Sequence, residues 1–259
     1  MSLATSSGFF TDVATVARRA VRSLAREPEA LIPALVVPMF FYAVNIGALQ
    51  VVAEDLGDGF DFKAFQLPVA IIFAVTGVSR ANVVVVDIQS GYLDKLLVTP
   101  VKRSALLLGM MVADVVLVFG LSVLVSIVGF LVGVRFETGL LGVLAFLLLA
   151  SAWGLAFTGF PYTIALVTGN PAAVNSSFVV FFPFAFLTSA FLPLEALTSW
   201  LRSIARWNPV TYLLEGLRSL IIEGWDVTDL RNAVVAVVGL GAITFTMAFL
   251  ALNARVRTT

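Results

Sequence analysis

Two ionisable side chains, Arg80 and Asp114, stand inside long apolar runs and are the first candidates for chemistry in this sequence. A charge near the middle of a membrane helix costs about 2.5 to 3.5 kcal/mol, so such residues are rare and are usually paired or functional. A structural salt bridge between adjacent helices, proton coupling, contact with a substrate and snorkelling to the inner interface all remain open. The similar depths of the two residues in their runs favour the salt bridge.

The chain contains no cysteine and no histidine. Disulfides, thiolate nucleophiles, Cys/His metal sites and imidazole chemistry are therefore excluded, and any enzyme would have to use carboxylates, lysines or hydroxyls. We expect no metal site and no catalytic residue. The formal net charge is +0, which gives no indication of a nucleic-acid-binding surface.

Composition determines the class of protein. Hydrophobic residues make up 60% of the chain and charged residues 12%, and the mean hydropathy is +1.03. Soluble domains carry about 25% charged residues, so an integral membrane protein is predicted.

Six apolar runs reach the roughly 20 residues that a helix needs to cross a hydrocarbon core of about 30 Å. The period-two alternation of a membrane β-barrel is absent, so helices must satisfy the backbone. We predict an all-α membrane fold, a single domain over residues 1–259, with six spans: Leu31–Ala53, Leu67–Val86, Ala105–Val134, Leu140–Thr168, Val174–Leu192 and Asn232–Asn253.

Two amphipathic segments accompany the spans. Residues 1–30 predict a helix that lies in the membrane interface, with its arginines toward anionic headgroups. Residues 193–231 carry two apolar stripes separated by Asn208-Pro209, which predicts two short re-entrant helices before the last span. Glu215 and Arg218 are three residues apart in the second of these and could pair, either in a functional role or as an ordinary surface pair.

The Lys/Arg distribution predicts the orientation. An even number of spans puts both termini on one side, and the loops on that side hold more basic than acidic residues, whereas the opposite loops are acidic. The positive-inside rule therefore predicts a multi-pass protein with both termini in the cytoplasm. We expect its location to be the bacterial cytoplasmic (inner) membrane.

The cytoplasmic segment 87–104 joins the second and third predicted spans. Gly91 permits a turn, residues 92–98 can form two helical turns with leucines on one face, and Thr99-Pro100 ends them. Such a segment suits a groove on another protein, but its leucines could equally touch lipid.

Three blocks, Asp87–Pro100, Phe182–Glu195 and Asn208–Arg218, resemble the ABC-2 type exporter permeases, particularly the daunorubicin-resistance-like branch. The resemblance covers nearly the whole chain. It implies that the cytoplasmic segment is a coupling helix for a nucleotide-binding subunit, formed by Gly91, Tyr92, Leu93, Asp94, Lys95, Leu96, Leu97, Thr99 and Pro100.

The same resemblance implies partners. The sequence has no G-x-x-x-x-G-K-[ST] loop, so ATP and Mg²⁺ are expected on two copies of a separate ABC ATPase subunit, and this chain is not expected to be an enzyme. A second permease subunit is expected, with a homodimer preferred and a heterodimer as the alternative. Membrane lipid is a further partner.

The resemblance also implies a pathway and a cargo. Phe178, Phe181, Phe182 and Phe186 are candidates for an aromatic lining, although phenylalanines in membrane helices usually face lipid or neighbouring helices. An external gate would involve Asn208, Pro209, Tyr212, Glu215 and Arg218. The expected function is export of a hydrophobic or amphipathic molecule, first of all a drug-like one. A lipid or glycolipid exporter, an ion-coupled secondary transporter and a membrane scaffold without transport activity are alternatives.

Overall fold

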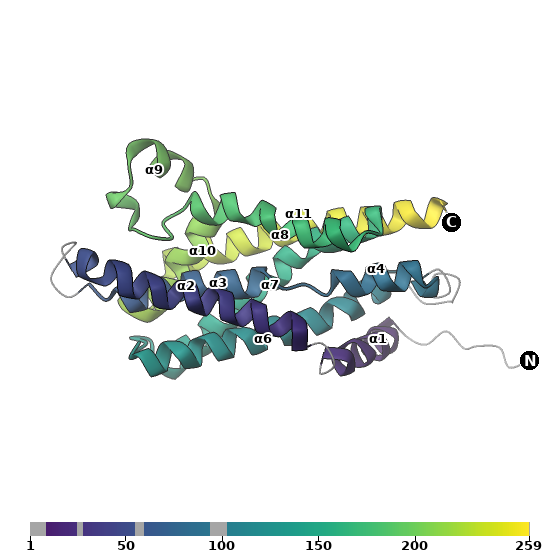
Figure 1. Cartoon of the computed structure of the whole chain (residues 1–259), viewed down its shortest axis with the longest axis horizontal. Helices are drawn as coiled ribbons and strands as arrows, with labels where there is room; N and C mark the ends of the chain where they lie inside the picture. The colour runs from purple at the N-terminus through teal and green to yellow at the C-terminus, as the bar shows by residue number, and fades with distance from the viewer. Residues whose placement is uncertain (1–8, 25–27, 55–59, 94–102, 259) are drawn as a thin grey trace, which may run out of the picture.

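The computed structural model describes residues 9–24, 28–54, 60–93 and 103–258, and every regular element in these ranges is helical (Figure 1). The elements in chain order are α1 (Phe9–Leu24), α2 (Pro28–Glu54), α3 (Phe62–Thr76), α4 (Ala81–Gln89), α6 (Arg103–Val132), α7 (Gly139–Thr168), α8 (Pro171–Phe186), the 3₁₀ turn η1 (Leu194–Ala196), α9 (Ser199–Ala205), α10 (Pro209–Arg218), the π turn η2 (Ser219–Glu223) and α11 (Val227–Thr258).

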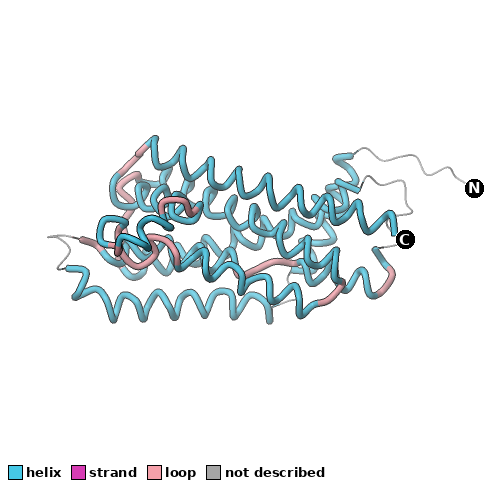
Figure 2. The backbone as a smooth tube through the Cα atoms, turned by 90° about the horizontal axis from the view of Figure 1, so that it is seen from above, coloured by secondary structure: helices cyan, strands magenta, loops and turns pink. Residues whose placement is uncertain are grey.

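The long helices run side by side along the longest axis of the molecule (Figures 1 and 2). Helix α1, the end of α4, the start of α6 and the C-terminus lie at one end, which we call the terminal end. Helix α9 lies at the opposite end, which we call the α9 end. Helix α1 and the C-terminal end of α11 thus lie at the same end of the bundle.

Five stretches are long and apolar enough to cross a membrane: Ile32–Leu49, Phe62–Gln89, Leu107–Val132, Gly139–Thr168 and Val227–Arg255. They correspond to five of the six predicted spans. The remaining predicted span is α8, whose 16 residues give about 24 Å of helix, less than the hydrocarbon thickness. A sixth crossing therefore stays a prediction.

The second predicted span, Leu67–Val86, lies within the membrane-length stretch Phe62–Gln89, but it is not one continuous helix. Helix α3 ends at Thr76 and α4 begins at Ala81. The break survives inside the bundle because protein groups satisfy the backbone there: the Asp114 carboxylate accepts the Arg80 N–H (2.8 Å), and the Ser79 hydroxyl accepts the Ala81 N–H (3.2 Å).

Helix α7 is the centre of the bundle and packs against α3, α4, α6, α8 and α11. The Trp153 ring is buried at its middle and donates its Nε1–H to the Thr76 hydroxyl of α3 (3.0 Å). At the crossing with α11, a Cβ on Gly159 would lie 2.7 Å from the Thr244 carbonyl carbon, so only glycine permits this approach. Small residues at a helix crossing are typical of membrane packing.

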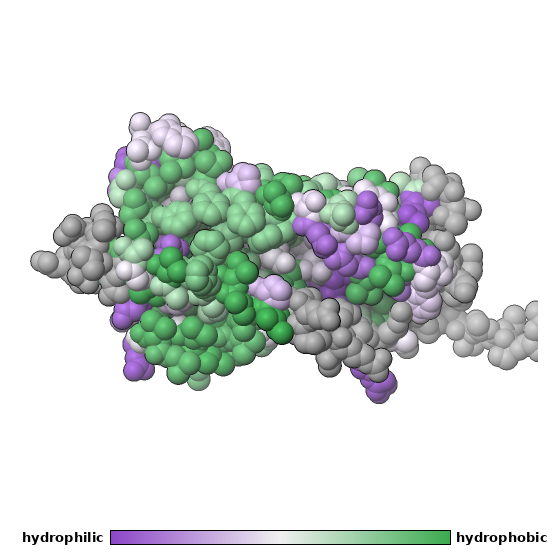
Figure 3. Space-filling view, in the orientation of Figure 1, coloured by the Kyte–Doolittle hydropathy of each residue, from purple (hydrophilic) through white to green (hydrophobic). Residues whose placement is uncertain are grey.

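The outer surface of the bundle is apolar. Phe40, Leu131, Leu140 and Ile243 are each at least 60% exposed. Figure 3 shows hydrophobic residues over most of the visible face, with hydrophilic residues gathered toward the terminal end. Exposed aliphatic and aromatic side chains at this density are what lipid-facing helices require.

The two flanking segments are helical where the sequence predicts helices. Helix α1 lies within the predicted segment 1–30, and α9 and α10 lie within 193–231 with Asn208-Pro209 at their junction. In α10, Leu213, Leu214 and Leu217 are buried, as the apolar stripe requires. The depth of these helices in the membrane stays a prediction.

Candidate functional site

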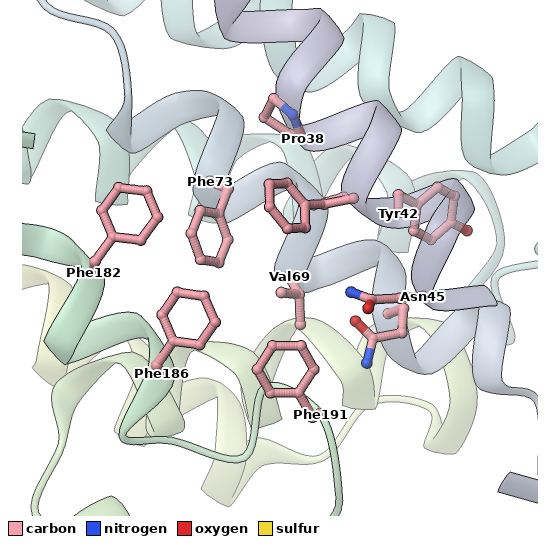
Figure 4. Close-up of a pocket in the computed structure, with 11 residues that line it drawn as sticks. Pro38, Tyr42, Asn45, Val69, Phe73, Phe182, Phe186 and Phe191 are labelled. Carbon is pink, nitrogen blue, oxygen red and sulfur yellow. The ribbon is translucent and has the colours of Figure 1, made fainter. Parts of the chain in front are cut away.

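An open cleft lies between α2 and α8 with α3 as its floor, and we call it the aromatic cleft. It consists of two hollows that share Pro38, Phe41, Phe73 and Phe182, and the hollow nearer to Gly77 has a volume of about 240 Å³. Figure 4 shows the rings of Phe73, Phe182, Phe186 and Phe191 gathered in this space, opposite Pro38 and Tyr42 of α2.

Phe73 of α3 contacts two of the other rings in the cleft. Its centroid lies 5.9 Å from those of Phe182 and Phe186, in T-shaped geometry. Phe182 and Phe186 stack at 5.9 Å, and Phe186 stacks on Phe191 at 5.5 Å. Both the T-shaped and the stacked arrangement are favoured by the ring quadrupoles, so the rings that line the cleft stabilise one another's positions. Sequence reasoning did not select Phe73, because it stands alone in an aliphatic run and no spacing marks it.

Three of the four predicted pathway residues line the cleft. Phe178, Phe182 and Phe186 follow one another at intervals of four and share one face of α8. Phe181 is turned away from that face, is only 1% exposed, and packs against Phe73 (5.6 Å) and Phe157 of α7 (5.5 Å). It supports the wall of the cleft from behind.

Uncharged amides mark both ends of the cleft. Asn45 and Gln66 line it on the side of the α9 end. Toward the terminal end, Asn175 stands one turn before Phe178 on α8, and its Oδ1 accepts the Asn82 amide N–H of α4 (2.7 Å). No charged side chain is among the described residues that line the two hollows. The cleft is therefore suited to an apolar or aromatic body with neutral polar groups.

At the α9 end, Arg218 is buried and connects α10 to two other segments. Its guanidinium donates to the Phe65 carbonyl (3.1 Å), the Ser189 hydroxyl (3.1 Å) and the Ala190 carbonyl (3.4 Å). It also lies 3.4 Å from the centroid of the Phe65 ring. The hydrogen bonds of Arg218 thus go to α3 and the 189–190 turn, whereas Glu215 interacts with it through charge alone.

Asn208 connects α8 to α10. Its Oδ1 accepts the Val210 N–H (2.9 Å) as the cap of α10, and its amide donates to the carbonyls of Phe184 (2.6 Å) and Leu187 (3.0 Å) at the end of α8. Pro209 occupies the first helical position, where its missing N–H costs nothing. The Tyr212 hydroxyl donates to the Arg206 carbonyl (2.5 Å), which closes the α9–α10 turn.

The structure brings Arg80 and Asp114 together at the break between α3 and α4. The buried Asp114 carboxylate accepts the main-chain N–H of Arg80 with one oxygen and the Tyr162 hydroxyl of α7 (2.6 Å) with the other. The Arg80 guanidinium donates through Nη1 to the Ala20 carbonyl of α1. The Asp114 carboxylate of α6 therefore connects the α3–α4 break and α7 through its two hydrogen bonds. The Arg80 side chain adds a hydrogen bond from the break to α1.

The comparison with known proteins agrees with this architecture. The family model for the ABC-2 type transporter matches residues 11–222. This chain belongs to the ABC-2 type transporter family.

Several curated proteins are similar to this chain over most of its length. A daunorubicin resistance ABC transporter permease protein of Streptomyces coeruleorubidus is 25% identical over 219 residues, which are 81% of this chain and 75% of the relative. A probable doxorubicin resistance ABC transporter permease protein of Mycobacterium tuberculosis is 25% identical over 224 residues, 83% and 79% respectively. A putative transport permease of Cyanophora paradoxa is 26% identical over 227 residues, 85% and 77%. The chain is thus a multi-pass membrane permease of the ABC exporter type, and such permeases work with separate ATP-binding subunits.

The predicted coupling segment of this ABC-2 permease is described only at its start. Gly91 has a φ of +67°, which supports the predicted turn. Tyr92 is half-buried, and Leu93 is fully buried in a cluster with Leu107 of α6 and Tyr162 of α7. Leu93 therefore anchors the segment to the bundle and is not free to contact a partner. The other predicted residues, Asp94, Lys95, Leu96, Leu97, Thr99 and Pro100, lie outside the described residues.

Among the described residues of the permease, no group of three or more acidic side chains is placed to hold a metal ion. The acidic residues near α10 interact through charge. Burial and the Asp229 carboxylate raise the pKa of Glu215 to about 7, and Arg218 opposes this rise. Burial likewise raises the pKa of Glu223.

The raised pKa of Glu215 predicts a pH-dependent stability. As the pH rises from about 4.5 to 7, the carboxyl ionises freely in the unfolded chain but resists ionisation in the folded one, so the folded state is progressively destabilised. Glu215→Gln removes this penalty. We expect the melting temperature of the variant in detergent to exceed that of the wild type at pH 8 and to match it at pH 5.

Glu137→Gln is the matched control, because Glu137 is exposed and its main-chain N–H donates to the Ile221 carbonyl of η2, which directly follows α10 (3.0 Å). An equal effect of the two substitutions at pH 8, or a benefit of Glu215→Gln that is as large at pH 5, would contradict the assigned environment.

Proposed function

We propose that this ABC-2 permease exports a hydrophobic or amphipathic small molecule, drug-like rather than ionic, along the aromatic cleft. The observation that carries the proposal is the cleft itself: a surface of interlocked phenylalanine rings, flanked by the amides of Asn45, Gln66 and Asn175. Planar or apolar molecules gain from ring contacts of this kind, whereas an ion would be desolvated without a counter-charge. The names of the bacterial relatives, which refer to daunorubicin and doxorubicin resistance, support the same class of cargo.

The proposal includes the assembly. Two permease copies, in a homodimer, would work with two copies of a separate ABC ATPase that binds ATP and Mg²⁺. The cleft supports a dimer because it is open between α2 and α8, so a second copy facing it would close a central path. The coupling segment 87–104 would dock into the ATPase, with Leu93 as its anchor within the bundle.

The proposed placement follows the charge distribution. Both termini and the coupling segment would face the cytoplasm of a bacterial inner membrane, α1 would lie in the inner interface, and α9 and α10 would form the external re-entrant segment of residues 193–231. Helix α8 with the residues after Phe186 would complete a sixth crossing. Asn208, Pro209, Tyr212, Glu215 and Arg218 would then stand at the exit.

The test is uptake into inverted membrane vesicles that contain the permease and the ATPase subunit. A fluorescent amphipathic dye is expected to accumulate when ATP is added, and a proton gradient alone is expected to give no uptake. Uptake driven by the gradient without ATP would support an ion-coupled transporter instead. Transfer of a fluorescent lipid but not of the dye would support a lipid exporter, and failure to move either would support a scaffold.

A substitution in the coupling segment tests whether this segment links the permease to the ATPase subunit. Leu96→Asp is expected to abolish ATP-driven uptake and co-purification of the ATPase while the permease itself stays folded. Ser90→Asp is the control, because Ser90 is exposed and precedes Gly91, the first residue assigned to the coupling helix. If Leu96→Asp leaves both association and uptake intact, the coupling role of this segment is wrong.

A further inference from the structure

A second groove runs along the other side of α8, and we call it the lateral groove. Helices α8 and α11 pack on α7 from two sides and leave a hollow of about 300 Å³ between them, whose floor includes Trp153 and Phe157. A second hollow of about 240 Å³ continues it toward α9, and the two share Phe184 and Pro209. The lateral groove is separate from the aromatic cleft, because Phe178, Phe182 and Phe186 face the opposite side of α8.

The walls of this groove offer almost nothing to a polar ligand at membrane depth. Among the described residues that line the main hollow, Thr244 has the only polar side chain apart from the Trp153 indole, and its hydroxyl donates to the carbonyls of Ala156 and Gly241. The Trp153 Nε1–H is likewise used by Thr76. The occupant of the main hollow must therefore have an apolar surface, because an extended peptide or a headgroup would leave its hydrogen-bonding groups unpaired.

The opening of the groove lies on the lipid-facing surface. Val180 and Phe184 on α8 are about half exposed, and Ile243 on α11 is 63% exposed. At the α9 end, Trp207 is 87% exposed and Arg206 beside it is also exposed. An aromatic side chain and a cation at the end of an apolar channel match the interface where lipid chains meet phosphate groups.

We propose that the lateral groove binds one acyl chain of a membrane phospholipid, with the phosphate near Arg206 and the chain lying over Trp153. The site differs from the export pathway and does not depend on the cargo. A bound chain would fill the gap between α8 and α11 and so support the back of the wall that Phe181 forms behind the aromatic cleft.

Trp153 gives a direct measurement. In the full-length permease, Trp200, Trp207 and Trp225 are replaced by phenylalanine, which leaves Trp153 as the sole tryptophan. The protein is reconstituted in phosphatidylcholine vesicles whose acyl chains are brominated at mid-chain, and its emission is compared with that in unbrominated vesicles. Trp153 is 1% exposed and lines the groove, so a chain within the groove brings bromine closer to its ring than the surrounding lipid does, and most of the emission is expected to be lost.

Filling the groove tests its role in this loss. Val180→Phe with Ile243→Phe is expected to restore the emission, whereas Val179→Phe with Val238→Phe adds the same bulk at lipid-exposed positions that do not line the groove, and should leave the quenching unchanged. Size-exclusion profiles establish that both variants are folded. Bright Trp153 in brominated vesicles, as expected if a second copy covers the groove, overturns the proposal, and so does quenching that survives the filling.

Discussion

Asp114→Ala is expected to lower the free energy of unfolding by about 2 to 6 kcal/mol, since two buried donors lose their acceptor at about 1 to 3 kcal/mol each. These donors are the Arg80 N–H at the break between α3 and α4 and the Tyr162 hydroxyl of α7. Neither has water to replace the carboxylate, because Asp114 and Tyr162 are fully buried. Thermal unfolding of the purified permease in detergent measures the effect, and vesicle uptake is expected to be lost with it.

Two further substitutions show which interaction is responsible. Tyr162→Phe removes one donor and is expected to cost less than Asp114→Ala, and the double variant should be less destabilised than the two single effects added together. Ser122→Ala, on the same helix, loses only a bond to the Val118 carbonyl one turn back and is the control. Equal melting temperatures for Asp114→Ala and Ser122→Ala would contradict the structural role.

Asp114→Asn separates a structural from a proton-carrying role. The amide oxygen can still accept one of the two donors, so a structural carboxylate should give a partly stable and partly active variant. A proton carrier would instead lose all uptake at unchanged stability. The geometry favours the first result, because both carboxylate oxygens are already occupied by donors from the protein.

The sequence predicted the proximity of Arg80 and Asp114 but not the form of their contact. Hydropathy averaged over a span-length window cannot register a four-residue interruption, so the second span was expected to be continuous. The break at Gly77–Arg80 depends on a capping carboxylate from another helix, which is a tertiary feature. The resemblance indicated Phe178, Phe181, Phe182 and Phe186 without distinguishing Phe181, which is buried behind the cleft. Phe73 emerged only from the packing of α3 against α8, which is also a tertiary feature.

For the coupling segment too, the sequence pattern predicted only part of what the structure shows. The pattern placed Leu93, Leu96 and Leu97 on one apolar face, which is consistent with docking to a partner. The burial of Leu93 against α6 and α7 shows that the bundle itself takes the first of these leucines. Periodicity identifies an apolar face but not which molecule covers it.

Arg218→Gln is expected to destabilise the permease by about 2 to 4 kcal/mol, because charge-assisted hydrogen bonds and the contact with the Phe65 ring are lost together. The Phe65 carbonyl would remain buried without its donor. Arg218→Lys keeps the charge but not the planar fork, so an intermediate loss is expected. Arg231→Gln is the matched control, because Arg231 is an exposed arginine near the start of α11, the helix on which α10 packs. Melting temperatures in detergent measure the effect and should be lowest for Arg218→Gln, intermediate for Arg218→Lys and highest for Arg231→Gln.

The loss of stability in Arg218→Gln should also depend on pH. Arg218 lowers the pKa of Glu215, so its removal disfavours the ionised Glu215 carboxylate still further. The variant should therefore be less stable at pH 8 than at pH 5.5. If the α9–α10 segment closes the exit, dye-loaded vesicles of this variant will also leak without ATP, while Arg231→Gln vesicles stay sealed. A pH-independent loss would mean that Glu215 and Arg218 are not coupled. An unchanged melting temperature together with vesicles that do not leak would mean that Arg218 does not hold α10 against α3. Another interaction would then have to keep the proposed exit closed.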